Sequence, residues 1–110
     1  MKRYTRGSAA AIGLLVLWSS AASAQQSPSV QRGATLARTH CARCHSIDKV
    51  SESPLKIAPP FRTLHERYPV ERLEEPLAEG IVTGHPTMPE FRFDPDQITD
   101  FIAFLKSLER

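Results

Sequence analysis

Three side chains with a fixed spacing offer the clearest chemistry in this sequence: the thiols of Cys41 and Cys44 and the imidazole of His45. Two thiols separated by two residues in a tight turn can each add to one vinyl group of a haem. The residue that follows then points its imidazole at the iron from the same side. C-x-x-C-H is the signature of this attachment. The motif predicts one covalently bound haem c, held by Cys41 and Cys44, with His45 as an iron ligand.

Other interpretations of the two cysteines stay open. A C-x-x-C pair can be a redox-active dithiol, but the βαβ pattern that houses such a pair is missing from the sequence. The pair can also be half of a zinc site, although the chain has no second pair of cysteines and its other histidines lack zinc-finger spacing. The motif can also arise by chance. We expect haem attachment, because the export signal described below independently favours it.

A sixth iron ligand is needed if the haem is to transfer electrons without binding other molecules, and a methionine thioether often fills this role opposite histidine. Apart from Met1, the chain contains one methionine, Met88, in the segment Pro86-Thr87-Met88-Pro89. The two prolines restrict the backbone, which suits a residue that holds a weak ligand in place. We predict that Met88 ligates the iron. The alternatives are that Met88 fills a gap in the core or that a histidine takes its place: His85 foremost, then His65 and His40.

Residues 1–24 have the features of a secretory signal peptide. Basic residues open the chain, residues 9–18 are apolar, and Ala22-Ser23-Ala24 is a small-x-small cleavage site. We predict cleavage before Gln25, a mature domain over residues 25–110 and a periplasmic location. An uncleaved anchor is the alternative. Because the apolar run is shorter than the roughly 20 residues that span a bilayer, we do not expect the mature protein to be embedded in a membrane.

The charge balance changes once residues 1–24 are set apart. They hold three of the 14 Lys and Arg and none of the 12 Asp and Glu, which leaves 11 basic and 12 acidic residues over 25–110. A net charge of −1 does not indicate a nucleic-acid partner or an anionic membrane surface. A domain this small has a limited core, which a cofactor often helps to stabilise.

Capping residues mark two helix starts. Ser27 is an N-cap candidate, and Pro28 takes the first position of a helix that continues to about His40. The segment Asp94-Pro95-Asp96-Gln97 resembles a capping box and begins an apolar last helix. Glycine inside a helix costs about 1 kcal/mol relative to alanine. We therefore expect Gly33 where another element crosses closely.

The middle of the chain is less regular. Residues 48–60 are polar and contain prolines, so they are predicted as a loop, followed by a short helical turn over 61–66. Apolar residues at helical spacing over 70–81 predict an amphipathic helix, which Pro76 kinks or divides into two. The predicted fold class is all-α, with three to five helices around one haem and no strand.

The order of these features resembles that of the class I c-type cytochromes, the small bacterial monohaem cytochromes c, over essentially all of residues 25–110. The resemblance implies that Gly33 packs against Phe101 or Phe104. It also implies that the Pro59 carbonyl accepts a hydrogen bond from the ring of the histidine that follows the cysteines. Two departures are the lack of tryptophan after Trp18 and the lack of a dense set of lysines.

The function implied by this resemblance is that of a single-electron carrier with no catalytic residues and no small-molecule substrate. Its partners would be redox proteins, a donor and an acceptor that the sequence does not identify. Two alternatives stay open. One is an electron-transfer subunit of a larger dehydrogenase complex. The other is a haem sensor or enzyme in which the side of the haem opposite the histidine opens.

Overall fold

The computed structural model describes residues 2–3, 7–22, 25–81 and 87–110. In chain order, the elements are α1 (Pro28–His40), the 3-10 helices η1 (Phe61–Glu66) and η2 (Val70–Leu73), α2 (Glu74–Glu79) and α3 (Pro95–Ser107). The described residues contain no strand, which confirms the all-α prediction. Over the same residues, no helix has the length and apolar character needed to cross a membrane.

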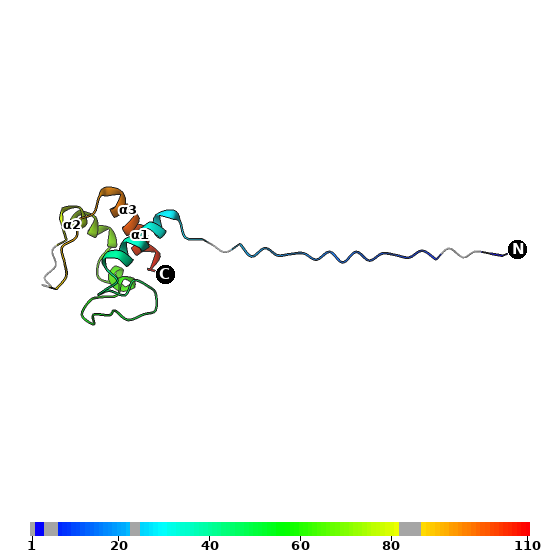
Figure 1. Cartoon of the computed structure of the whole chain (residues 1–110), viewed down its shortest axis with the longest axis horizontal. Coiled ribbons are helices and arrows are strands. Elements are labelled where there is room, and N and C mark those ends of the chain that lie inside the picture. Colours follow the sequence, from blue (N-terminus) through cyan, green and yellow to red (C-terminus); the bar gives the residue numbers. More distant parts are fainter. Residues whose placement is uncertain (1, 4–6, 23–24, 82–86) are drawn as a thin grey trace.

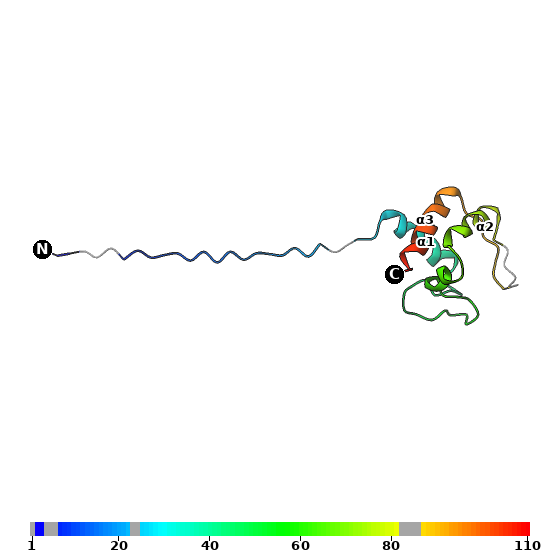
Figure 2. The same cartoon turned by 180° about the vertical axis from the view of Figure 1, so that it is seen from behind.

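The N-terminal segment stands apart from the helices. Residues 7–22 run away from the helical domain as an extended chain (Figures 1 and 2). Their large apolar side chains are exposed, and Leu15 and Trp18 reach 90% and 89%. The expected cleavage site lies partly outside the described residues, because Ser23 and Ala24 are not among them. The signal peptide over 1–24 and the domain boundary at residue 25 stay predictions.

Both capping predictions are confirmed. The Ser27 hydroxyl accepts a hydrogen bond from the Val30 N–H at 3.3 Å, and α1 begins at Pro28. At the start of α3, Asp94 and Gln97 form the two reciprocal hydrogen bonds of a capping box, with the Gln97 Oε1 3.0 Å from the Asp94 nitrogen. These caps satisfy N–H groups that a helix start otherwise leaves without partners.

Helices α1 and α3 cross at Gly33. A Cβ placed on this glycine would lie 2.0 Å from the backbone oxygen of Asp100 and 2.6 Å from the Phe104 Cβ. Phe104 is therefore the aromatic residue at the crossing. Phe101 packs instead against Phe61, with ring centres 5.9 Å apart in an edge-to-face arrangement.

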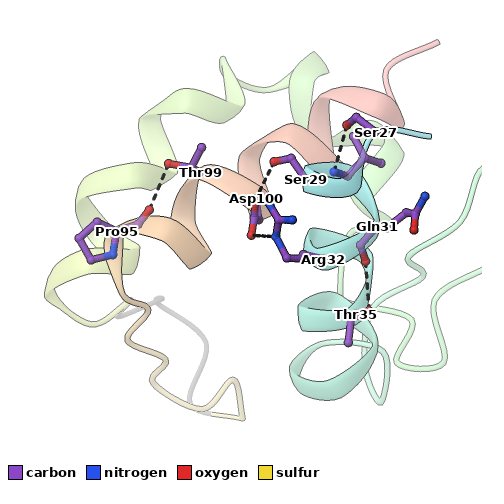
Figure 3. A network of polar contacts seen from close by, with 9 residues as sticks. Ser27, Ser29, Gln31, Arg32, Thr35, Pro95, Thr99 and Asp100 are labelled. Carbon is purple, nitrogen blue, oxygen red and sulfur yellow. Dashed lines mark hydrogen bonds and ion pairs between the residues drawn. The ribbon is translucent and has the colours of Figure 1, made fainter. Parts of the chain in front are cut away.

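A buried carboxylate joins the same two helices (Figure 3). Asp100 is 9% exposed; it receives the Arg32 Nε at 2.7 Å, the Arg32 Nη2 at 3.0 Å and the Ser29 hydroxyl at 2.7 Å. The hydrogen bond from Arg32, followed by that from Ser29, lowers the pKa of Asp100 against the opposing effect of desolvation. These three donors fix the orientation of α1 against α3.

The predicted amphipathic helix over 70–81 is divided, as Pro76 suggested, but it ends earlier than expected. The Glu74 N–H bonds the carbonyl three residues back, which makes η2 a 3-10 turn, and α2 then begins with Pro76 in its first turn. Proline lacks the N–H that a continuous helix would need there. Gly80, with φ of +110°, ends α2 and leaves Ile81 outside it.

Candidate cofactor site

The two cysteines and the following histidine lie in a turn that continues from the end of α1. The Cys41 and Ala42 N–H groups both bond the Ala37 carbonyl, at 2.8 and 3.0 Å, and the Cys44 and His45 N–H groups bond the Cys41 carbonyl, at 3.2 and 2.9 Å. This turn brings the three side chains to the wall of the same cavity. Both cysteines are half-buried free thiols.

The chemistry of Cys41 differs from that of a redox-active dithiol. Burial raises the pKa of its thiol to about 12, because a low-dielectric environment disfavours the thiolate. Catalytic C-x-x-C motifs instead depend on a thiol whose pKa is lowered. Within the described residues, no three His, Cys, Asp or Glu side chains gather where they could hold a metal ion by themselves.

His45 is oriented by its neighbours. Its Nδ1 lies 2.8 Å from the Pro59 carbonyl oxygen. Since a carbonyl oxygen can only accept, Nδ1 is the donor, and in the neutral ring Nε2 then keeps a lone pair. The ring also packs on Phe61, with centres 4.9 Å apart, and the Phe61 N–H bonds the Ser46 carbonyl at 3.0 Å. The loop that contains Pro59 and Phe61 thus holds the imidazole in one orientation.

A cavity of about 510 Å³ adjoins these side chains. Its volume is within the range of small-molecule and cofactor sites. The walls are mostly apolar, and the lining residues are Thr39, His40, Cys41, Arg43, Cys44, His45, Leu55, Ile57, Ala58, Pro59, Phe61, Leu64, Tyr68, Leu73, Leu77, Ile81, Thr87, Met88, Pro89, Phe91, Phe93 and Phe101. An apolar chamber with two thiols, an imidazole and a thioether on its walls fits a haem: a large apolar ring, two vinyl groups and an iron.

Met88 lines the same cavity as His45, although the two residues are far apart in the sequence. The chain returns to the helices just after Met88: the Ile81 N–H bonds the Phe91 carbonyl at 2.9 Å, and the Phe93 N–H bonds the Leu77 carbonyl at 2.8 Å. These bonds tie the segment after Met88 to the end of α2. Only the tertiary fold brings the imidazole and the thioether to one chamber.

The other histidines differ in their placement. His65 is exposed on η1 and is absent from the cavity lining. His40 lines the cavity, and its ring packs against Phe91 and Phe93 at 5.7 and 5.5 Å between centres. His85, the main rival ligand, lies outside the described residues, as does Pro86.

Sequence reasoning missed this packing role of His40. The available signal was Phe91 and Phe93, two aromatic residues in alternate positions of an extended segment. Such spacing places two side chains on one face. Because His40 immediately precedes Cys41, these ring contacts join the segment that follows Met88 to the end of α1.

Comparison with protein families gives a match over most of the chain. The family model described as Cytochrome c matches residues 30–109, which include α1 from its third residue, every later helical element, both cysteines and Met88. No curated protein and no solved structure matches the chain.

Proposed function

Because the chain belongs to the cytochrome c family through residues 30–109, we propose that it is a periplasmic carrier that passes single electrons between redox proteins. In this proposal, Cys41 and Cys44 hold the haem c and His45 and Met88 ligate its iron. The family binds haem c with its iron, and membership carries haem-based electron transfer. The observation that supports the proposed ligands is the apolar cavity that both His45 and Met88 line.

The roles of the chain's own residues follow from their positions. The Cys41 and Cys44 thiols would bind the haem covalently, which would make the cofactor part of the core. When bound, the haem supplies an iron that changes reversibly between the ferric and ferrous states. The Pro59 carbonyl accepts a hydrogen bond from Nδ1 of His45, so the Nε2 lone pair of the neutral ring would be available to the iron.

Met88 would close the other side of the iron. A thioether is a weak ligand that favours the ferrous state and raises the potential relative to a second histidine. If His45 and Met88 both bound the iron, they would keep other small ligands off it. Buried Phe61, Leu64 and Phe101 line the chamber and give it an apolar wall.

Absorption spectra of the protein matured with a haem-attachment system test this function. We expect sharp reduced bands of a c-type haem, a weak ferric near-infrared band from sulfur ligation, and no change when carbon monoxide is added to the reduced protein. Met88→Ala should abolish the sulfur band and admit carbon monoxide, whereas the matched variants His65→Ala and His85→Ala should retain the wild-type spectra. A sulfur band that persists in Met88→Ala would show that Met88 is not the sulfur ligand. Carbon monoxide binding to the wild type would favour a sensor or enzyme.

The periplasmic location has its own test. Fractionation of a bacterial host should recover the haem protein in the periplasm. Its intact mass should correspond to a chain that begins at Gln25. Recovery of a membrane-bound product that retains residues 1–24 would support the uncleaved anchor instead.

A further inference from the structure

His40 ends α1 and immediately precedes Cys41, yet the proposed function gives it no role. Its ring lies against two phenylalanines of the segment that follows Met88. The ring centres are 5.7 Å apart for Phe91, at an interplanar angle of 66°, and 5.5 Å apart for Phe93, at 57°. His40 is exposed, although it also lines the cavity. Burial therefore does not explain why this residue contacts both rings.

The contact of His40 belongs to a longer series of aromatic contacts around the cavity. In order, the rings are those of His40, Phe93, Phe101, Phe61 and His45, with successive centres 5.5, 5.6, 5.9 and 4.9 Å apart. All five residues line the cavity. The three phenylalanines are buried and meet edge to face, an arrangement that aromatic pairs prefer. The series thus joins His45, through rings fixed in the core, to the segment that follows Met88.

Hydrogen bonds hold this segment on its other side. Besides the main-chain bonds of Phe91 and Phe93 to the end of α2, the Arg92 Nη2 donates to the Glu79 carbonyl at 2.8 Å. Alternate side chains therefore make opposite contacts: Arg92 contacts α2, whereas the rings on either side of it contact His40. The segment is held between α2 and the end of α1.

The position of Met88 depends on this segment. Met88 lies three residues before Phe91, and both residues line the cavity. A methionine thioether is a weak iron ligand. The fraction of molecules in which it leaves the iron therefore depends on the free energy that holds its segment in place. A contact between the segment and α1 would reduce that fraction.

Resting on the proposed function, we propose that His40 is a positioning residue for Met88, whose segment it holds beside the iron through its contacts with Phe91 and Phe93. Both neighbours are uncharged rings, so the contribution comes from the packing of the imidazole ring and not from its charge. A phenylalanine in place of His40 would keep the contact, whereas an alanine would lose it.

Binding of free imidazole to the ferric holoprotein measures how often Met88 leaves the iron. Its apparent affinity is the affinity of the open form multiplied by the fraction of open molecules, and loss of the near-infrared sulfur band reports binding. An aromatic contact changes such an equilibrium constant several-fold, so we expect His40→Ala to raise the imidazole affinity about tenfold. His40→Phe should stay within about twofold of the wild type.

Two further variants separate positioning from a general loss of stability. Asp100→Asn weakens the bonds to Ser29 and Arg32, near the opposite end of α1 from His40. It should lower the melting temperature and leave the imidazole affinity within about twofold of the wild type. Arg38→Ala changes an exposed residue of the same helix and should alter neither quantity. An equal gain in imidazole affinity for Asp100→Asn and His40→Ala would overturn the positioning role.

Phe91→Leu tests the same contact from the other partner and leaves the residue beside the cysteines intact, so it also serves if His40→Ala does not mature. It should raise the imidazole affinity several-fold. The double variant His40→Ala/Phe91→Leu should raise it by less than the product of the two single effects, because both changes remove one shared contact. Single effects that multiply fully would show that the two rings do not act together and would overturn the proposal.

The outcomes separate this inference from the proposed function. A wild-type ferric protein without a sulfur band would contradict Met88 as a ligand and with it the proposed function. A wild type with that band, and with an imidazole affinity that neither His40→Ala nor Phe91→Leu changes, would overturn the positioning role alone. So would a His40→Phe protein that opens as often as His40→Ala. A gain in affinity with alanine that phenylalanine reverses would establish the role of His40.

Discussion

Replacing Gly33 by alanine would push a methyl group into the crossing of α1 and α3. The added Cβ would lie 2.0 Å from the Asp100 oxygen, whereas ordinary contacts begin at 3.4 Å, so the backbones must separate by roughly 1.4 Å. Since the atom it meets is backbone, no rotamer change relieves the clash. The same movement would pull Arg32 from Asp100, whose three hydrogen bonds span the crossing.

The expected loss combines two opposing effects. Overpacking costs about 3 kcal/mol at the upper end of its usual range, which a rigid backbone contact justifies. Alanine stabilises a helix by about 1 kcal/mol relative to glycine. Gly33→Ala should therefore destabilise the holoprotein by about 2 kcal/mol, which in a domain of this size lowers the melting temperature by about 10 °C.

Thermal unfolding followed by far-ultraviolet circular dichroism measures this loss. Arg38→Ala and Arg38→Gly form the matched control, because Arg38 is exposed on the same helix and the pair reports the propensity difference without a clash. A Gly33→Ala protein at least as stable as the wild type would refute the assignment of Gly33 to a close crossing.

Three further predictions address the carboxylate at this crossing, the end of α2 and the two cysteines. Asp100→Asn should lower the free energy of unfolding near neutral pH. Because the folded-state pKa of Asp100 is depressed, its contribution to stability is present above about pH 4 and is lost as the pH falls below that. Urea titrations of the wild type and the variant should therefore converge in acid, and a difference in stability that stays constant with pH would contradict this account. Gly80→Ala should destabilise the protein by about 1–3 kcal/mol in guanidinium unfolding, because φ of +110° strains any other residue and the added Cβ would meet the Glu90 carboxylate. A variant as stable as the wild type would mean that the backbone relaxes at this position. Cys41→Ala and Cys44→Ala should each reduce the yield of haem-stained protein, and normal accumulation without haem would show that folding does not depend on attachment.

Local patterns were enough to determine where the first and last helices begin. Ser27 with Pro28, and Asp94 with Gln97, cap α1 and α3 through hydrogen bonds within three residues, and such short-range bonds follow directly from sequence. The attachment motif is equally local, because Cys41, Cys44 and His45 lie within one turn. The family match confirms what these motifs predicted about the cofactor and the fold.

The end of the α2 region shows where a periodic pattern is insufficient. Ile81 continues the apolar spacing of Leu77, yet the helix stops before it, because Gly80 takes a positive φ and the Ile81 N–H bonds the Phe91 carbonyl instead. That hydrogen bond joins two segments on either side of Met88. The apolar spacing within residues 70–81 does not indicate whether the Ile81 N–H continues the helix or bonds a segment farther along the chain.

The surroundings of the predicted site residues depended on the tertiary structure alone. It brought His45 and Met88 to one cavity, set the Asp100 carboxylate against the Arg32 guanidinium, and left Ile57 exposed at the cavity mouth. These relations join residues distant in sequence or depend on what covers a side chain. The sequence therefore determined the cofactor type and the helical frame through short-range covalent and hydrogen-bonding constraints, whereas the chamber and the residues that surround it depended on how the helices pack.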